Sequence, residues 1–261
     1  MECSSQAPSQ CTIENLSSKH EDVMQLYLIR HAQSYNNALE DSRNRVQDPD
    51  LSDIGFEQAR LLGEYLKDAV DMGQERPIRY KPMTFTHLYV SPMKRTLQTA
   101  QPIAEALGMT PHIWTDIHEI GGIFLADDEG NTTGFGGLTR TEIATTFKGY
   151  VIPEHVTDKG WWKPDDGQET PANFLSRAIR VALDLRSRAS TDDVICLVSH
   201  AAFLDALVKA LLNQAPTHPD DLFYLHFNTG ITRFDFLNPY GRLRMTYFNR
   251  TTHLPATMQT S

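Results

Sequence analysis

Two histidines in this sequence each follow a short apolar run, and one of them stands beside an arginine. His31 follows Leu26–Ile29 and Arg30, and His200 follows Val194–Ser199. An unprotonated imidazole nitrogen can attack phosphorus, and histidine titrates close enough to neutrality to supply that nitrogen. The planar guanidinium group of arginine binds phosphate oxygens. The two motifs indicate phosphoryl transfer, although an Arg-His pair alone also ends many surface strands.

Apolar runs that alternate with amphipathic segments predict an α/β fold. We expect strands at 26–30, 86–90, 111–117, 194–199, 230–236 and 242–247. We expect helices at 52–70, 91–108, 139–147, 170–188 and 201–212. This alternation indicates a mostly parallel central sheet with helices on both faces, and the last two strands form a hairpin that makes the sheet mixed.

Capping residues define where several of these helices begin. Ser52 is a plausible N-cap, and Ser91-Pro92 and Thr170-Pro171 each place an N-cap before a proline in the first turn. The run Thr139-Arg140-Thr141-Glu142 matches a capping box. Pro102 is expected to kink or break its helix, because proline lacks a backbone N–H group.

Ligands of α/β folds bind at the carboxyl ends of the strands, where both histidines lie. His200 also precedes the helix 201–212, whose free N–H groups and dipole favour an anion. A lone histidine at such a junction is more often structural than catalytic, so its role depends on its neighbours. We expect Arg95, one turn into its helix, to lie close to His31.

Phosphate-ester cleavage needs a nucleophile, positive charge at the phosphate oxygens and a proton for the leaving alkoxide. In this hypothesis His31 is the nucleophile, with one ring nitrogen held as N–H by a backbone acceptor. A raised pKa would keep Glu119 protonated as the acid, with Asp116 and His118 as competing donors. The groups expected to hold the phosphate are Arg30, Arg95, a protonated His200, Ser34, Asn37 and the backbone N–H of Ala201. No metal or cofactor is expected, because the cations are built in.

The order of these residues resembles the histidine phosphatase superfamily, in its phosphoglycerate mutase-like branch. The matching segments are Arg30-His31, Asn37, Leu51–Ala59, Ser91–Ala100, Glu119, Gln168-Glu169-Thr170 and Val198-Ser199-His200. The resemblance runs from about Gln25 to Phe248 and implies the α/β fold and the residue roles given above. Ala32 and Ala201 replace the family's glycine after each histidine. Alanine keeps the N–H group and is tolerated where φ is negative.

Three functions are open: a phosphatase for a small-molecule phosphate monoester, a phosphoglycerate-type mutase, and a non-catalytic binding protein on the same fold. In mutases of the family, an Arg-His-Tyr run that helps to bind the second acid follows the acid glutamate. This sequence has Ile120-Gly121-Gly122 there, which favours hydrolysis. Every chemical position is filled, which disfavours the binding protein. The natural substrate and the oligomeric state stay open.

The amino-acid composition limits the kinds of partner and substrate that this protein can bind. The 261 residues are 40% hydrophobic and 22% charged, as in soluble globular proteins, and the formal net charge is −9. An acidic chain is a poor general nucleic-acid binder, so a local cationic pocket must capture an anionic substrate. Cys3, Cys11 and Cys196 give neither a disulfide framework nor zinc-site spacing. We expect a cytoplasmic protein, because no segment reads as a secretion signal or a membrane span.

One domain over 23–250 is the simplest organisation, with a disordered N-terminal tail at 1–22 and a C-terminal tail at 251–261 that is also expected to be disordered. The segment 121–167 is rich in glycine and interrupts the strand–helix alternation, so we expect a lid over the site. Its Trp161 and Trp162 could cover the leaving group, and its Arg140 and Lys163 could add charge, although packing explains the aromatic residues about as well.

Overall fold

The computed structural model describes residues 23–72, 80–237 and 242–261. Its central sheet has the strand order β10-β9-β1-β8-β4-β5. The parallel strands are β1 (Val23–Arg30), β8 (Val194–Ser199), β4 (His87–Val90) and β5 (Pro111–Ile113). The antiparallel edge consists of β9 (Ile231–Leu237) and β10 (Arg242–Arg250). The predicted mixed, mostly parallel α/β sheet is therefore confirmed.

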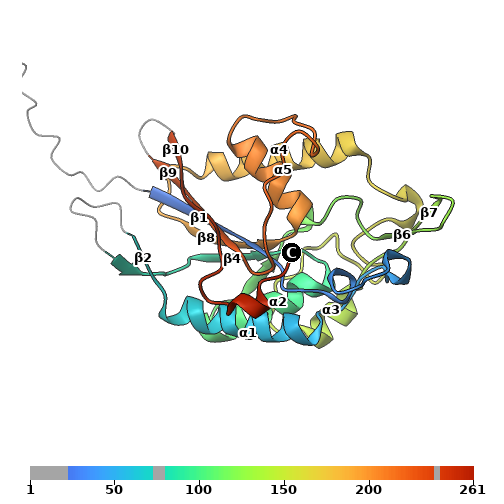
Figure 1. The fold of residues 1–261 in the computed structure, drawn as a ribbon, viewed down its shortest axis with the longest axis horizontal. Coiled ribbons are helices and arrows are strands. Elements are labelled where there is room, and N and C mark those ends of the chain that lie inside the picture. The colour runs from blue at the N-terminus through green and yellow to red at the C-terminus, as the bar shows by residue number, and fades with distance from the viewer. Residues whose placement is uncertain (1–22, 73–79, 238–241) are drawn as a thin grey trace, which may run out of the picture.

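Helices cover both faces of this sheet (Figure 1). One face carries α1 (Asp53–Asp68) and α2 (Lys94–Leu107), and the other carries α4 (Pro171–Ser187) and α5 (Ala201–Leu211). Alternate side chains of a strand point to opposite faces. Leu26 and Leu28 of β1 accordingly pack in the cluster with α4 and α5, whereas Tyr27 and Ile29 pack in the cluster with α1 and α2.

Short elements complete the described chain. They are β2 (Val70–Met72), β3 (Tyr80–Pro82), β6 (Phe124–Ala126), β7 (Thr132–Gly134) and α3 (Arg140–Thr146). The predicted strand 111–117 is shorter than expected, because a 3₁₀ turn at Thr115–Ile117 follows β5 and buries Ile117 against α4 and α5. Within the described ranges, no helix is long and apolar enough to span a membrane.

The N-cap residues predicted from the sequence are confirmed at three of four positions. The Ser52 hydroxyl accepts from the Gly55 N–H, Thr139 and Glu142 form a capping box, and Thr170 accepts from the Asn173 N–H. The prediction for Ser91 is wrong, since α2 begins at Lys94 with Met93 as its N-cap. The Ser91 hydroxyl is used elsewhere, against His200.

Pro102 does not break its helix. It lies inside α2, which continues to Leu107 and ends at Gly108 in the left-handed conformation. An interior proline costs roughly 3 kcal/mol of helix stability, and tertiary packing can outweigh that cost. Here α1 packs so closely that a Cβ atom on Gly63 would lie 2.7 Å from the Pro102 carbonyl oxygen.

The C-terminal segment is ordered, contrary to the expectation of a disordered tail after Thr251. Thr260 exchanges hydrogen bonds with Asn228, and Gln58 donates to the Met258 carbonyl and the Thr260 hydroxyl. These polar partners, Gln58 and Asn228, come from two parts of the chain that are distant in sequence, so no local pattern predicts the contacts. Asn228 also donates to the His31 carbonyl at 2.9 Å, which links the segment to the site. The predicted tail at 1–22 lies outside the described residues.

We predict that Thr260→Val lowers the free energy of unfolding by about 1–3 kcal/mol, because the buried Asn228 and Gln58 each lose a partner. Urea denaturation measures the effect. Thr257→Val is the matched control, since Thr257 is exposed in the 3₁₀ turn Ala256–Met258. Equal losses in both variants would mean that the Thr260 contacts do not hold the segment.

Besides His31 and His200, four of the described histidines have a lowered pKa, and the three with the largest shifts are His118, His226 and His253. Burial lowers the pKa of His118 to about 3, helped by Arg177. Burial also lowers the pKa of His226 to about 4 and that of His253 to about 4. The unfolded chain binds protons at these histidines near pH 6.5, so acid favours unfolding. Asp48 acts in the opposite direction, because burial raises its pKa to about 6.

We therefore predict that stability falls as the pH drops from 6.5 towards 4. Each of the three histidines contributes a slope of roughly 1.4 kcal/mol per pH unit, against the opposite slope of Asp48. The measurement is urea denaturation at several pH values for the wild type and for His226→Phe. The free energy of unfolding of the variant should depend less steeply on pH, by the equivalent of one proton taken up on unfolding. Identical slopes in the two proteins would rule out a neutral buried His226.

Candidate active site

The carboxyl ends of β1 and β8 bring His31 and His200 together. Arg30 and Ser199 are paired in the parallel register, and the His31 N–H donates to the Ser199 carbonyl at 2.8 Å. The ring centroids of the two histidines lie 5.1 Å apart. Both side chains are buried, with relative exposures of 3% for His31 and 0% for His200. The two histidine motifs thus form one site.

The ring of His31 is oriented by its own backbone. Its Nδ1 lies 2.7 Å from the Ala32 carbonyl oxygen, which can only accept, so Nδ1 carries the hydrogen. The lone pair is then on Nε2, which lies 3.2 Å from the Nε–H of Arg95. Burial, together with the charges of Arg95 and Arg30, holds the pKa of His31 well below its usual value. His31 is therefore a neutral imidazole whose unprotonated Nε2 accepts a hydrogen bond from the Nε–H of Arg95.

Arg30 is held against the last part of the chain. Its Nη1 donates to the His226 carbonyl oxygen at 2.6 Å, and its side chain is 5% exposed. Its buried Nε has no hydrogen-bond partner among the described residues. Burial lowers the pKa of Arg30 to about 10, with Glu119 opposing that shift, so the group stays charged at neutral pH.

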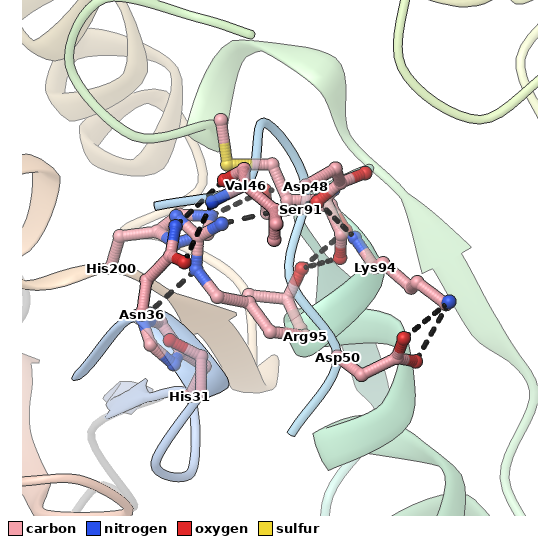
Figure 2. A network of polar contacts seen from close by, with 12 residues as sticks. His31, Asn36, Val46, Asp48, Asp50, Ser91, Lys94, Arg95 and His200 are labelled. Atoms are coloured by element: carbon pink, nitrogen blue, oxygen red, sulfur yellow. Dashed lines mark hydrogen bonds and ion pairs between the residues drawn. The ribbon is translucent and has the colours of Figure 1, made fainter. Parts of the chain in front are cut away.

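Arg95 projects from the first turn of α2 towards His31 (Figure 2). Its Nη1 lies 3.9 Å from the Asp48 carboxylate, which also accepts from the Lys94 N–H. Burial lowers the pKa of Arg95, against the charges of Asp48 and Glu119. The expected position of Arg95 near His31 is observed.

His200 differs from the sequence expectation in its charge. Its Nε2 lies 2.7 Å from the Ser91 hydroxyl oxygen, and its Nδ1 is buried without a partner in the described chain. Burial first, and then the charge of Arg95, hold the pKa of His200 well below its usual value. This direction opposes the expected protonation of His200, and the positive charge beside His31 comes from Arg30 and Arg95.

Glu119 occupies the N-terminus of α5. Its carboxylate oxygens accept from the N–H groups of Phe203 at 3.0 Å, Ala202 at 3.3 Å and Ile120 at 2.9 Å. The helix N-terminus that we expected to bind an anion thus binds a carboxylate of the chain itself. Ala201, expected to donate its N–H to substrate, is the first residue of this helix.

Asp116 and His118, the two competing proton donors, make contacts that hold the loop carrying Glu119 in place. His118 is 5% exposed and packs between Trp161 and Trp162, with Nδ1 against the Glu119 carbonyl at 2.7 Å. The carbonyl oxygens of Asp116 and His118 both accept from the buried Arg177, which the sequence analysis did not identify.

Arg177 explains the Gln168-Glu169-Thr170 turn. The Glu169 carboxylate accepts two hydrogen bonds from the Arg177 guanidinium group, at 2.9 and 2.6 Å. The side chains are 3% and 6% exposed. Breaking such a buried pair is strongly destabilising. Arg177, held by this pair, fixes α4 to the loop that carries Glu119 through its Nη1 bonds to the Asp116 and His118 carbonyl oxygens.

His31 lines a cleft of about 960 Å³, whereas His200 is fully buried behind it and is not part of the lining. Its lining includes the predicted residues Arg30, His31, Ser34, Asn37, Arg95 and Glu119. Ser34 and Asn37 bond to each other in a capping box, with the Ser34 hydroxyl donating to the Asn37 amide oxygen at 3.0 Å. Among the described residues, no group of three histidine, cysteine or acidic side chains could hold a metal ion.

The segment 121–167 contributes to this cleft in a different way from the one expected. Phe124 and Leu125 of β6 line it, whereas Trp161 and Trp162 pack on His118. Trp161 and Trp162 are not among the residues that line the cleft, and their contacts with His118 favour the packing alternative over a role in covering the leaving group.

Charge around the cleft also differs from expectation. Arg140 donates to the carbonyl groups of Pro153 and Val156, so its charge is used within the segment 121–167. The cleft is instead lined by Arg43 and Arg45, which the sequence analysis missed. The feature that could have identified them is the occurrence of two arginines close together in the polar loop after His31.

Comparison with known proteins agrees with this geometry. The family model described as "Histidine phosphatase superfamily (branch 1)" matches residues 26–248. A curated relative, the "Probable phosphoglycerate mutase" of Yersinia pestis, is 26% identical over 215 residues, which cover 82% of this chain and 86% of the relative.

A phosphoserine phosphatase from Entamoeba histolytica is 24% identical with a TM-score of 0.54, covering 89% of this chain and all of that chain. A mycobacterial glucosyl-3-phosphoglycerate phosphatase is 19% identical with a TM-score of 0.54, covering 88% and 100%. At these identities the structures support the fold. With the family model matching most of its length, the chain belongs to the histidine phosphatase superfamily, branch 1.

Proposed function

We propose that this protein is a phosphatase that hydrolyses a small-molecule phosphate monoester through a phosphohistidine at His31. The observation that carries the proposal is the neutral imidazole of His31, whose Nδ1 is anchored to a carbonyl and whose Nε2 lies beside Arg95. A neutral nitrogen with a fixed lone pair is the form of histidine that attacks phosphorus. Arg30 and Arg95 supply the positive charge that an anionic ester needs.

In the first step, Nε2 of His31 forms a bond to phosphorus as the bond from phosphorus to the ester oxygen breaks. The leaving alkoxide takes a proton from the carboxyl group of Glu119, which lines the cleft. The resulting carboxylate is stabilised by the N–H groups of Ala202 and Phe203 at the N-terminus of α5.

In the second step, water attacks the phosphorus of phosphohistidine and the Glu119 carboxylate takes its proton. The bond from phosphorus to Nε2 breaks, and inorganic phosphate leaves. Ser91 supports both steps by holding the second imidazole, that of His200, next to His31.

A phosphoglycerate-type mutase is the second candidate, and the curated relative from Yersinia pestis favours it. Against it stands the turn after Glu119. Gly121 and Gly122 have φ values of +87° and +74°, and a Cβ atom on Gly122 would lie 2.4 Å from the Trp162 ring. Residues with long side chains do not fit this turn. The turn therefore lacks the cationic run that would bind a second acid.

We predict that the phosphoryl group is recovered on His31. Rapid quench with a ³²P-labelled ester, followed by peptide mapping under alkaline conditions that preserve phosphohistidine, locates it. His31→Ala should abolish labelling, whereas His112→Ala, an exposed histidine on β5, should not. Label on His200, or on no histidine, would refute the mechanism, and absence of turnover with aryl phosphates would favour a binding protein.

We also predict that Glu119→Gln slows hydrolysis of alkyl phosphates by about 10²–10⁴-fold and affects aryl phosphates much less, because aryloxide leaving groups need little protonation. Steady-state kinetics with one ester of each kind measures the difference. Asp116→Asn, the change in the neighbouring carboxylate, should not produce this split. An equal loss on both esters in Glu119→Gln would indicate a structural role.

A further inference from the structure

The cleft is much larger than a phosphate group, and one part of its wall is cationic. Its volume of about 960 Å³ is at the upper end for small-molecule sites. Arg43 and Arg45 line it from the loop that follows His31, and Asp127 and Asp128 line it from the β6–β7 turn. Arg30 and Arg95 are used for the scissile phosphate. The outer arginines are therefore available for another part of the substrate.

The loop that carries these arginines is held in place. The side-chain amide of Asn36 donates to the Val46 carbonyl at 2.7 Å and accepts from the Val46 N–H at 3.1 Å. Figure 2 shows this pair next to Arg95. A loop that is ordered before the ligand arrives loses less entropy on binding.

Acidic residues attach the same loop to α2. Asp48 accepts from the Lys94 N–H at 3.0 Å, and Asp50 accepts from the Lys94 ammonium and from Gln98 (Figure 2). These contacts join the loop to the helix that carries Arg95. The outer arginines thus keep a fixed relation to the catalytic arginine.

The two outer arginines differ in their partners. The Arg43 guanidinium group donates to both oxygens of Asp41, with its Nη2 2.7 Å from Oδ2. Arg45 is exposed and has no ion-pair partner in the described part of the chain. The charge of Arg45 also reaches Arg95, where it contributes to the lowered pKa. Arg45 therefore lines the same cleft as the phosphate site and forms no ion pair with any described residue.

We propose that Arg45, assisted by Arg43, binds a second anionic group of the substrate, so that the preferred esters carry a carboxylate or a second phosphate beyond the scissile phosphate. This inference rests on the proposed function. A guanidinium group binds either anion through paired N–H donors. Asp127 and Asp128 repel an anion from the β6–β7 side, which confines it to the side of Arg45.

The test compares three-carbon esters that differ in the second group: glycerol 3-phosphate, 3-phosphoglycerate and propane-1,3-diyl bisphosphate. Calorimetry on the His31→Ala protein measures their dissociation constants without turnover. We expect at least one of the two doubly anionic esters to bind about tenfold more tightly than glycerol 3-phosphate, as for one charge-assisted contact. Which one does so identifies the second group as a carboxylate or a phosphate.

Substitutions then assign the effect. In the same background, Arg45→Gln should remove most of the tenfold difference, and Arg43→Gln should remove less because Asp41 already neutralises Arg43. Arg60→Gln is the matched control, since Arg60 is an exposed arginine of α1 paired with Glu57 and Glu64, and it should keep the difference. Higher salt should reduce the difference in the wild-type loop.

Equal affinities for the three esters, or a difference that survives Arg45→Gln, would overturn this inference. Turnover by the unmodified protein is measured separately. An Arg45-dependent affinity difference without any turnover would refute the proposed phosphatase function and leave this inference standing. Turnover without the affinity difference would refute this inference and leave the proposed phosphatase function standing.

Discussion

The site depends on keeping an imidazole neutral between two guanidinium groups. Burial and the charges of Arg30 and Arg95 all disfavour protonation of His31, so its Nε2 lone pair is retained. The same arginines attract the phosphate ester that the lone pair attacks. One electrostatic arrangement therefore prepares both the nucleophile and the binding site, and it needs a position where water does not screen the charges.

The surrounding fold supplies that position through hydrogen bonds from distant segments. The Thr229 N–H donates to the Arg30 carbonyl, and Asn228 donates to the His31 carbonyl. These bonds fix the backbone at the end of β1 from the turn before β9 on one side, while β8 fixes it from the other. Arg177 and Glu169 hold the loop of Glu119 in the same way from α4.

Much of this could be predicted from the sequence, because local patterns encode it. Apolar runs marked β1 and β8, and the caps at Ser52, Thr139 and Thr170 marked three helices. The carboxyl ends of β1 and β8 and the first turn of α2 bring His31, His200 and Arg95 together, although the predicted cap of α2 was wrong.

The failures share a cause, which is contact between parts of the chain that lie far apart in the sequence. Ser91 looked like a cap but bonds to His200, and the charge of His200 depends on an environment that no local pattern states. The C-terminal segment looks disordered by composition, yet Gln58 and Asn228 supply its partners from afar. Arg45 stands in an unpatterned loop, and only the cleft reveals it.

The protonation state of His31 in solution tests the account most directly. Long-range ¹H–¹⁵N spectra of histidine-labelled protein distinguish the neutral tautomers from the imidazolium form, and His31→Ala assigns the signal. The account predicts a neutral Nδ1–H tautomer that does not titrate between pH 7.5 and pH 6, the region where an unperturbed histidine titrates, roughly pH 6.5. An imidazolium form at neutral pH, or an Nε2–H tautomer, would contradict it.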